Sequence, residues 1–214
     1  FNHAPRGYGV AHKPGTLLLS EEEVAASMFV FANFNQLFKL DEGTWVAWVD
    51  ILRAVPNSVL VLMKFPGAPD APRRLSSSLE RAGVSADRLR WVPFCTLKED
   101  FLRISSMVDL FLDNWSYGAG TTGTDVLFAG APVLTLSGRR TLSRMGASQA
   151  RTLGSVSLVA RTKSEYVALA VRFGTCSRCR DTVEMRLRKG LRASPLFDVD
   201  SWTHNWENLV RSLW

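Results

Sequence analysis

A run of small and hydroxyl-bearing residues in the middle of the chain has the composition of an anion-binding turn. Residues 118–125 read Gly-Ala-Gly-Thr-Thr-Gly-Thr-Asp, between apolar stretches at 108–113 and 126–129. Small residues let a backbone come close to a bulky anion, and a helix that begins here would offer free N–H groups to phosphate oxygens. Thr121 and Thr122 would add hydroxyl donors. The alternative is a tight turn with ordinary threonine capping, and the run matches neither a Walker motif nor GxGxxG.

Asp125 falls one turn into the helix expected after this run. A carboxylate there could accept hydrogen bonds from a ribose diol, as acidic residues do in other nucleotide sites. Alternatively, its negative charge could simply stabilise the helix, because the helix dipole weakly favours a negative charge near the N-terminus. The residue types alone leave both interpretations open.

A second polar segment, Asn-Phe-Asn-Gln-Leu-Phe-Lys at 33–39, follows an apolar run of strand length. Polar amides and a lysine at the carboxyl end of a strand lie where an open parallel sheet binds its ligands. Lys39 could neutralise a departing diphosphate as a point charge. The alternative is a loop lysine that meets only solvent.

The three cysteines are too few for a disulfide framework. Cys176 and Cys179 form one CxxC without a second pair, and His3, His12 and His204 lie far from it in the sequence. Because a zinc site needs about four ligands, we expect no metal site and a structural or incidental role for the CxxC. Reduced thiols in a cytosolic or nuclear compartment fit this composition.

The net charge of +6 invites a nucleic-acid interpretation, but its distribution argues against one. The basic residues concentrate in 139–192, where Arg186, Arg188, Lys189 and Arg192 fall on one expected surface helix. No nucleic-acid motif accompanies them, so we expect a solvated face and no nucleic-acid partner. We also expect no membrane partner, because no apolar run approaches the roughly 18 residues of a membrane span and the N-terminus lacks the pattern of a secretory signal.

The elements that must position these residues follow a strand–helix alternation. Residues 1–20 have no clear period and are predicted to be a linker or the remnant of a preceding region, since the chain begins with Phe rather than Met. The predicted strands are 28–33, 59–65, 89–92, 108–113, 132–136 and 156–160, and the predicted helices lie around 45–52, 72–82, 98–105, 122–129, 143–151, 163–173, 181–192 and 201–214. Such alternation predicts an α/β fold, a Rossmann-like parallel sheet with helices on both faces, over residues 21–214.

Five longer motifs occur in one order along most of the chain. They are FANFNQLFK (31–39), VPNSVLVLMKFP (55–66), TTGTDVLFAGAPVLT (121–135), SRMGASQ (143–149) and SPLF (194–197). Together they resemble the C-terminal catalytic lobe of the O-linked N-acetylglucosamine (O-GlcNAc) transferase family. A related plant branch, the SPINDLY-type O-fucosyltransferases, is similar in the same lobe.

The resemblance implies a GT-B fold and a UDP-GlcNAc donor. It implies that Gln36 and Lys39 face the donor diphosphate, with Lys39 stabilising the UDP leaving group. Thr121 and Thr122 would bind phosphate at a helix N-terminus, and Lys98 and Asp125 would lie near the ribose. The reaction would be an inverting transfer to Ser or Thr hydroxyls of proteins, with no cofactor and no metal, and the expected partners are an N-terminal catalytic lobe and helical repeats of a longer protein.

Two positions depart from the family pattern. Gly120 stands where the family usually has a histidine before Thr-Thr, and Phe101 stands near the position of a histidine close to the uracil. Phe101 could stack on the base or simply pack in the core. These departures leave a catalytically inactive nucleotide-binding or scaffold protein, and a GDP-fucose-dependent transferase, as alternatives.

Overall fold

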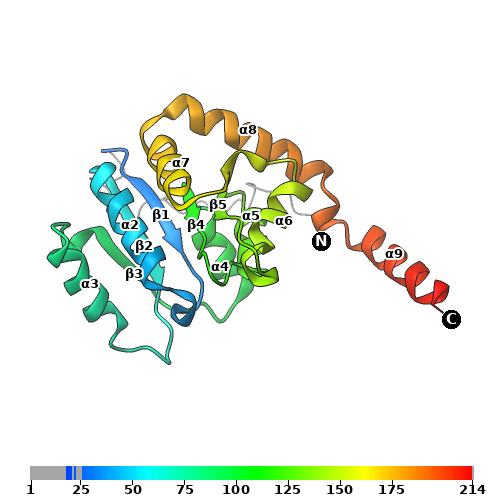
Figure 1. Cartoon of the computed structure of the whole chain (residues 1–214), viewed down its shortest axis with the longest axis horizontal. Helices are drawn as coiled ribbons and strands as arrows, with labels where there is room; N and C mark the ends of the chain where they lie inside the picture. The colour runs from blue at the N-terminus through cyan, green and yellow to red at the C-terminus, as the bar shows by residue number, and fades with distance from the viewer. Residues whose placement is uncertain (1–17, 21, 23–25, 214) are drawn as a thin grey trace.

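The computed structural model of the chain describes residues 18–20, 22 and 26–213. Its centre is a six-stranded sheet in the order β3-β2-β1-β4-β5-β6, in which every neighbouring pair is parallel (Figure 1). The strands are β1 Phe29–Asn33, β2 Ser58–Met63, β3 Leu89–Val92, β4 Leu110–Leu112, β5 Val133–Leu136 and β6 Val159–Ala160. The prediction of a Rossmann-like parallel sheet is confirmed. The predicted linker at 1–20 lies almost wholly outside the described residues.

Helices cover both faces of the sheet, as the apolar strands require. The α-helices are α2 Glu42–Ala54, α3 Ala71–Arg81, α4 Lys98–Ser105, α5 Thr121–Phe128, α6 Met145–Thr152, α7 Lys163–Thr175, α8 Ser177–Ala193 and α9 Val199–Ser212. One core joins α2, α3 and α7 to one face, with Trp48 and Tyr166 fully buried. The other joins α4, α5 and α8 to the opposite face, with Val126 and Leu187 buried. Burial on both faces explains why β1 and β2 are buried along their whole length and are apolar except for Asn33 and Ser58.

The predicted helices and strands occur with ends shifted by up to a few residues, and two predicted strands are much shorter. Asp41 caps α2 by accepting the Thr44 N–H at 2.8 Å, and Gly83 adopts φ 77° just after α3, a conformation that suits glycine. The strand predicted at 108–113 is only Leu110–Leu112. Beside it, the Asp109 carboxylate accepts the Val30 N–H at 2.8 Å, and the Asp109 N–H donates to the Val30 carbonyl at 3.0 Å. The strand predicted at 156–160 is mostly a short 3-10 helix, Val156–Leu158.

The expectation of reduced thiols at Cys176 and Cys179 is wrong for this structure, where the two form a disulfide. The cause is local: Cys176 ends α7 and caps α8, and its sulfur accepts the Cys179 N–H at 3.2 Å. This turn brings the two Cα atoms to 5.3 Å, within the range that a disulfide spans. The pair therefore links the end of α7 to the first turn of α8, while Cys95 is free.

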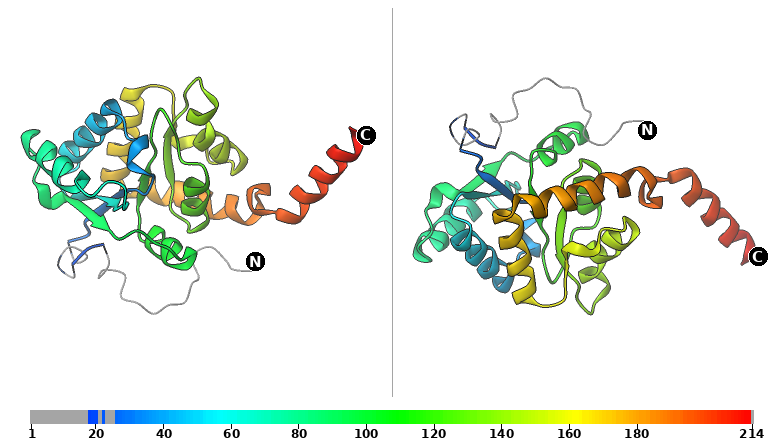
Figure 2. Two further views of the ribbon diagram at one scale, coloured as in Figure 1. Left: turned by 90° about the horizontal axis from the view of Figure 1, so that it is seen from below. Right: turned by 90° about the horizontal axis from the view of Figure 1, so that it is seen from above.

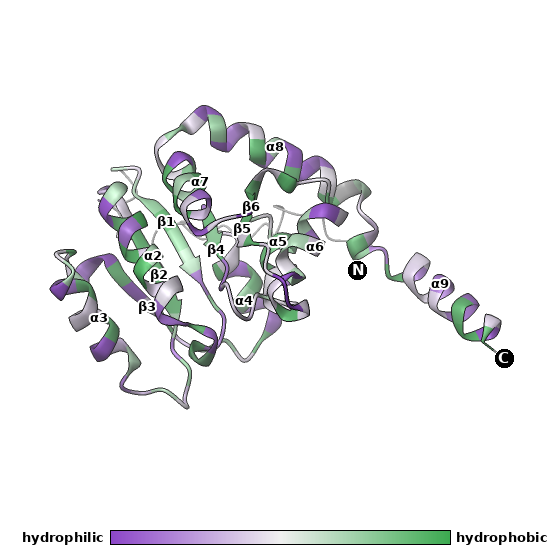
Figure 3. Ribbon diagram, in the orientation of Figure 1, coloured by the Kyte–Doolittle hydropathy of each residue, from purple (hydrophilic) through white to green (hydrophobic). Residues whose placement is uncertain are grey.

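The last helix, α9, projects away from the body of the molecule (Figures 1 and 2). Its apolar residues recur along one side and remain exposed, with Trp202 at 63% and Trp206 at 53%. The two indole rings stack at 6.0 Å with nearly parallel planes. Figure 3 shows the same helix alternating between apolar and polar residues, as an amphipathic helix does. Within the described part of the chain, no helix is long and apolar enough to cross a membrane.

Candidate functional site

The predicted site residues gather at the carboxyl ends of β1 and β4, the two central strands. The sheet order reverses here, because β2 and β3 continue on one side of β1 whereas β5 and β6 continue beyond β4 (Figure 1). Open parallel sheets bind ligands outside the strand ends at such a reversal. The segments after β1 and after β4 therefore converge at the expected place.

Three buried asparagines join these two segments. The Asn114 side-chain oxygen accepts one N–H from Asn33 at 3.0 Å and another from Asn35 at 2.8 Å. Its amide nitrogen donates to the Lys39 carbonyl at 3.2 Å. Because buried amides are costly to leave without partners, this network fixes the segment after β1 against the segment after β4. It sets the position of the Lys39 backbone.

Lys39 ends a short 3-10 helix, η1 Leu37–Lys39, and its side chain is half-buried. The ammonium lies over the Tyr117 ring, 4.1 Å from the ring centroid, which is a favourable cation–π geometry. Partial burial lowers the pKa of Lys39, and the negative charge of Asp113 opposes that shift. Gln36 precedes η1 and is exposed, and its side chain makes no capping hydrogen bond to η1.

The helix α5 begins at Thr121, as the glycine-rich run predicts. Its first intrahelical bond runs from the Thr124 N–H to the Gly120 carbonyl at 3.1 Å. The amides of Thr121, Thr122 and Gly123 come before this first bond, so they have no partner within the helix and point out of its N-terminus. Amides in this arrangement bind phosphate. The Thr121 side chain is exposed and that of Thr122 is half-buried.

Gly120 leaves little room for a side chain. A Cβ at this position would lie 2.9 Å from the terminal methyl of Met145. The side-chain amide of Gln149 on α6 also contacts this turn: it donates to the Gly120 carbonyl at 2.8 Å and to the Thr124 hydroxyl at 2.9 Å. The methionine therefore occupies space beside the position where the family usually carries a histidine.

Lys98 and Asp125, which the resemblance placed together, form an ion pair. The Lys98 ammonium at the start of α4 lies 2.5 Å from the Asp125 carboxylate on α5. The lysine is about half exposed whereas the carboxylate is mostly covered. Phe101, on the same helix as Lys98, packs against the Phe34 ring at 5.8 Å and against the core. Core packing is thus its observed role, and no contact in the structure tests base stacking.

The sequence did not indicate the buried residues whose hydrogen bonds position the site segments. The sequence predicts Asp113 only as the end of a strand and Gln149 only as part of the motif at 143–149, and it assigns no role to Asn114. An acidic residue at the end of an apolar strand, followed by Asn, was a usable signal for Asp113 and Asn114. No cluster of three or more His, Cys, Asp or Glu side chains that could hold a metal ion occurs in the described ranges.

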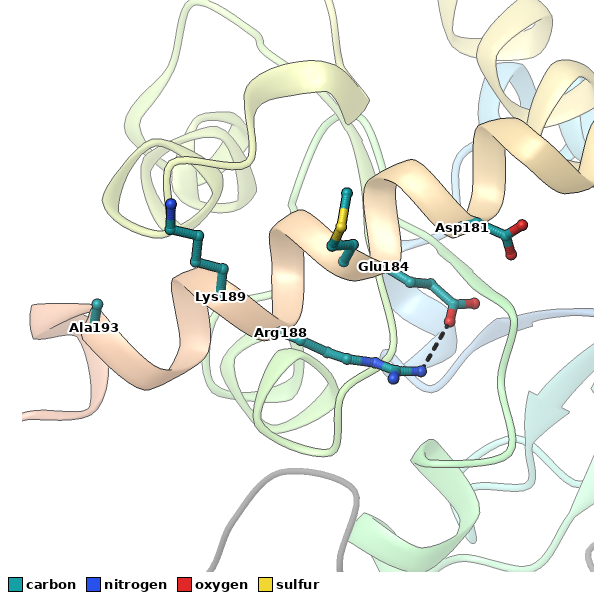
Figure 4. Close-up of a pocket in the computed structure, with 6 residues that line it drawn as sticks. Asp181, Glu184, Arg188, Lys189 and Ala193 are labelled. Atoms are coloured by element: carbon teal, nitrogen blue, oxygen red, sulfur yellow. Dashed lines mark hydrogen bonds and ion pairs between the residues drawn. The ribbon is translucent and has the colours of Figure 1, made fainter.

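A separate cavity of about 630 Å³ lies along α8 (Figure 4). Its described lining comes from that helix alone and includes the Glu184–Arg188 ion pair. None of its described lining residues belongs to the strand-end site. The cavity does not contribute to that site.

Comparison with known proteins agrees with this geometry. The profile of glycosyl transferase family 41 matches residues 16–206, which include every residue of the strand-end site. The chain belongs to glycosyl transferase family 41.

Relatives in this family are several times longer than the chain. A Caenorhabditis elegans UDP-N-acetylglucosamine–peptide N-acetylglucosaminyltransferase is 34% identical over 94% of the chain and 18% of its own length. A probable enzyme of the same description, SPINDLY from Petunia hybrida, is 35% identical over 86% of the chain and 20% of its own length. The chain thus spans about a fifth of the length of these curated relatives.

Solved structures show the same lobe. A mutant of the Thermobaculum terrenum O-GlcNAc transferase matches with a TM-score of 0.80 and 31% identity, over 87% of the chain and 36% of that structure. Anabaena HepE, solved with UDP and glucose, matches with a TM-score of 0.61 at 13% identity, over 88% of the chain and 53% of that structure, which shows a shared fold. The prediction of one lobe of a GT-B glycosyltransferase is confirmed.

Proposed function

We propose that this chain is the donor-binding lobe of a UDP-GlcNAc-dependent protein O-GlcNAc transferase, which transfers the sugar to Ser or Thr hydroxyls with inversion. The observation that carries the proposal is the convergence of the Lys39 ammonium and the α5 N-terminus at the strand ends. Names of the family relatives support the donor and the protein acceptor. In the same proposal the protein acts in the cytoplasm and nucleus.

The proposed chemistry is the departure of UDP as an acceptor hydroxyl attacks the sugar. Negative charge grows on the diphosphate as its bond to the sugar breaks, and fixed positive groups lower that barrier. Lys39 supplies a full charge, and the amides of Thr121 and Thr122 supply hydrogen bonds. The reaction as proposed needs no metal ion, because these groups neutralise the leaving group. The Lys98–Asp125 pair would hold the ribose, with Asp125 accepting its hydroxyls and Gln36 and Phe101 bordering the donor.

The exposed apolar side of α9 supports the proposal of a partner lobe. A soluble chain rarely leaves two stacked tryptophans open to water without a surface to cover them. In the proposal that surface is an N-terminal catalytic lobe in a longer protein that also carries helical repeats. Acceptor proteins would bind between the two lobes, so the isolated chain is expected to bind donor without transferring sugar.

A second candidate is a nucleotide-binding protein without transferase activity, which the replacement of histidine by Gly120 favours. Sugar transfer to a serine-containing peptide by a protein carrying both lobes separates the two candidates, since the inactive protein would bind UDP and transfer nothing.

Calorimetry on the purified chain tests the nucleotide. We expect UDP to bind, and GDP to bind at least about tenfold more weakly, because the proposed donor carries uracil and a site built for one base discriminates against another. Circular dichroism must confirm that the protein is folded. A folded chain that prefers GDP supports the fucosyl branch, and a folded chain that binds neither nucleotide contradicts the donor-lobe proposal.

A further inference from the structure

Asp113 is a buried acidic residue that holds the loop of the strand-end site in place. It follows β4 directly, its side chain has no exposed surface, and it accepts three hydrogen bonds. One carboxylate oxygen accepts the Asn114 N–H at 2.9 Å and the Ala119 N–H at 2.6 Å. The other accepts the Thr135 hydroxyl from β5 at 2.9 Å. A single side chain therefore joins both ends of the loop 114–119 to the neighbouring strand.

Two glycines allow the backbone to approach this carboxylate closely. A Cβ at Gly118 would lie 2.9 Å from its second oxygen, and a Cβ at Gly146 would lie 2.7 Å from the same atom. The backbone of the loop and that of α6 thus both approach the carboxylate directly. The Asp113 carbonyl is also held, because the buried Tyr166 hydroxyl donates to it at 2.9 Å.

The loop that Asp113 closes ends where α5 begins. Ala119, whose N–H it accepts, immediately precedes Gly120, the residue that caps α5. The orientation of the first amides of α5 therefore depends on this contact. Burial without a full ion pair raises the pKa of Asp113 to about 6, while the positive charge of Lys39 acts in the opposite direction.

We infer that Asp113 is a positioning residue for the donor diphosphate: its carboxylate closes the loop that aims the α5 N-terminus and that carries Tyr117, over whose ring the Lys39 ammonium lies. Two other titratable groups lie beside Asp113 and Lys39. The Tyr166 hydroxyl on α7 donates to the Asp113 carbonyl, and the ring of Tyr117 in the loop lies under the Lys39 ammonium. The negative charge of Asp113 favours the ammonium form of Lys39. Only the diphosphate part of this inference rests on the proposed function.

The test compares Asp113→Asn with the wild-type chain. Asparagine keeps the shape of the side chain and can still accept the Ala119 N–H, but it removes the charge. Nuclear magnetic resonance of chains carrying ¹³C-labelled lysine, with the Lys39 signal assigned from a Lys39→Arg variant, follows the titration of this one amine. We expect the Lys39 pKa to be lower in Asp113→Asn than in the wild type. A purely structural role would leave the titration unchanged.

Calorimetry with UDP gives the second readout. We expect Asp113→Asn to lose about tenfold in affinity at pH 7, and the loss to grow as pH rises, because neutral Lys39 cannot pair with the diphosphate. Wild-type UDP affinity in folded Asp113→Asn overturns the positioning role, and an unchanged Lys39 titration overturns the electrostatic effect of Asp113 on Lys39. Failure of the wild type to bind UDP would instead overturn the proposed function, while a lowered Lys39 pKa would still support the role of Asp113.

Thr135→Val is the second variant in case Asp113→Asn does not fold. It keeps the negative charge and removes one hydrogen bond to the carboxylate. We expect it to fold and to bind UDP several-fold more weakly than the wild type, because the carboxylate is less firmly oriented. Wild-type affinity in folded Thr135→Val would overturn the positioning role.

Discussion

Replacing Lys39 with alanine is expected to reduce UDP affinity about tenfold to a hundredfold, the range for losing a charged hydrogen-bond donor. In a protein that carries both lobes, the rate of sugar transfer is expected to fall further, by about a hundredfold to a thousandfold. The larger kinetic effect follows because negative charge on the diphosphate grows as the sugar bond breaks. Calorimetry measures the first loss, and a peptide glycosylation assay measures the second.

Two variants control this result. Lys189→Ala removes the same charge from an exposed position on α8 and should leave UDP affinity within about twofold of the wild type. Lys39→Arg keeps the charge but changes its geometry, so it should recover part of the binding and little of the transfer rate. Equal losses in Lys39→Ala and Lys189→Ala would show that only net charge matters, which contradicts the role proposed for Lys39.

Replacing Asn114 with alanine is expected to lower the free energy of unfolding by about 3 kcal/mol. The variant removes the partner of the buried Asn35 amide and one of the two partners of the Asn33 amide. It also frees the Lys39 carbonyl, so UDP affinity should fall together with stability. Urea unfolding followed by circular dichroism gives the first quantity, and calorimetry on the folded variant gives the second.

Asn57→Ala is the matched control, because Asn57 is exposed and donates to the Ala26 carbonyl at 2.9 Å. It should cost less than about 1 kcal/mol and leave UDP affinity unchanged. If Asn114→Ala costs no more than this control, the asparagine network does not hold the two segments together.

Much of the fold could be predicted because its signals are local. Continuous apolar runs such as 59–63 indicate strands covered on both faces, and the spacing of Trp45, Trp48, Val49 and Leu52 predicts the buried side of α2. The glycine-rich run likewise predicts the start of α5, because small residues followed by threonines mark a helix N-terminus wherever the helix packs. The hydrogen bond from the Val30 N–H to the Asp109 side chain beside β4 could not be predicted, because it joins residues 79 positions apart.

In the candidate site, too, the features with local sequence signals could be predicted and those that depend on distant residues could not. Residue type and the positions of strand ends propose Lys39, Thr121 and Thr122, and the resemblance places Lys98 and Asp125 near one another, where they form an ion pair. The supporting contacts were not found, because they join residues some 80 positions apart, as between Asn33 and Asn114, or 22 apart, as between Asp113 and Thr135. The disulfide at Cys176 was missed because composition favoured free thiols, whereas the turn between α7 and α8 decides the pairing.

The central claim is that the donor diphosphate lies between Lys39 and the N-terminus of α5. A titration of the ¹⁵N-labelled chain with UDP and with UMP, followed by amide resonances, tests it most directly. We expect UDP to shift the amides of Thr121, Thr122 and Gly123 most, and UMP, which lacks the second phosphate, to shift them less. If UDP binds but leaves these three amides unmoved and perturbs another surface, such as the α8 cavity, the diphosphate does not lie between Lys39 and the N-terminus of α5.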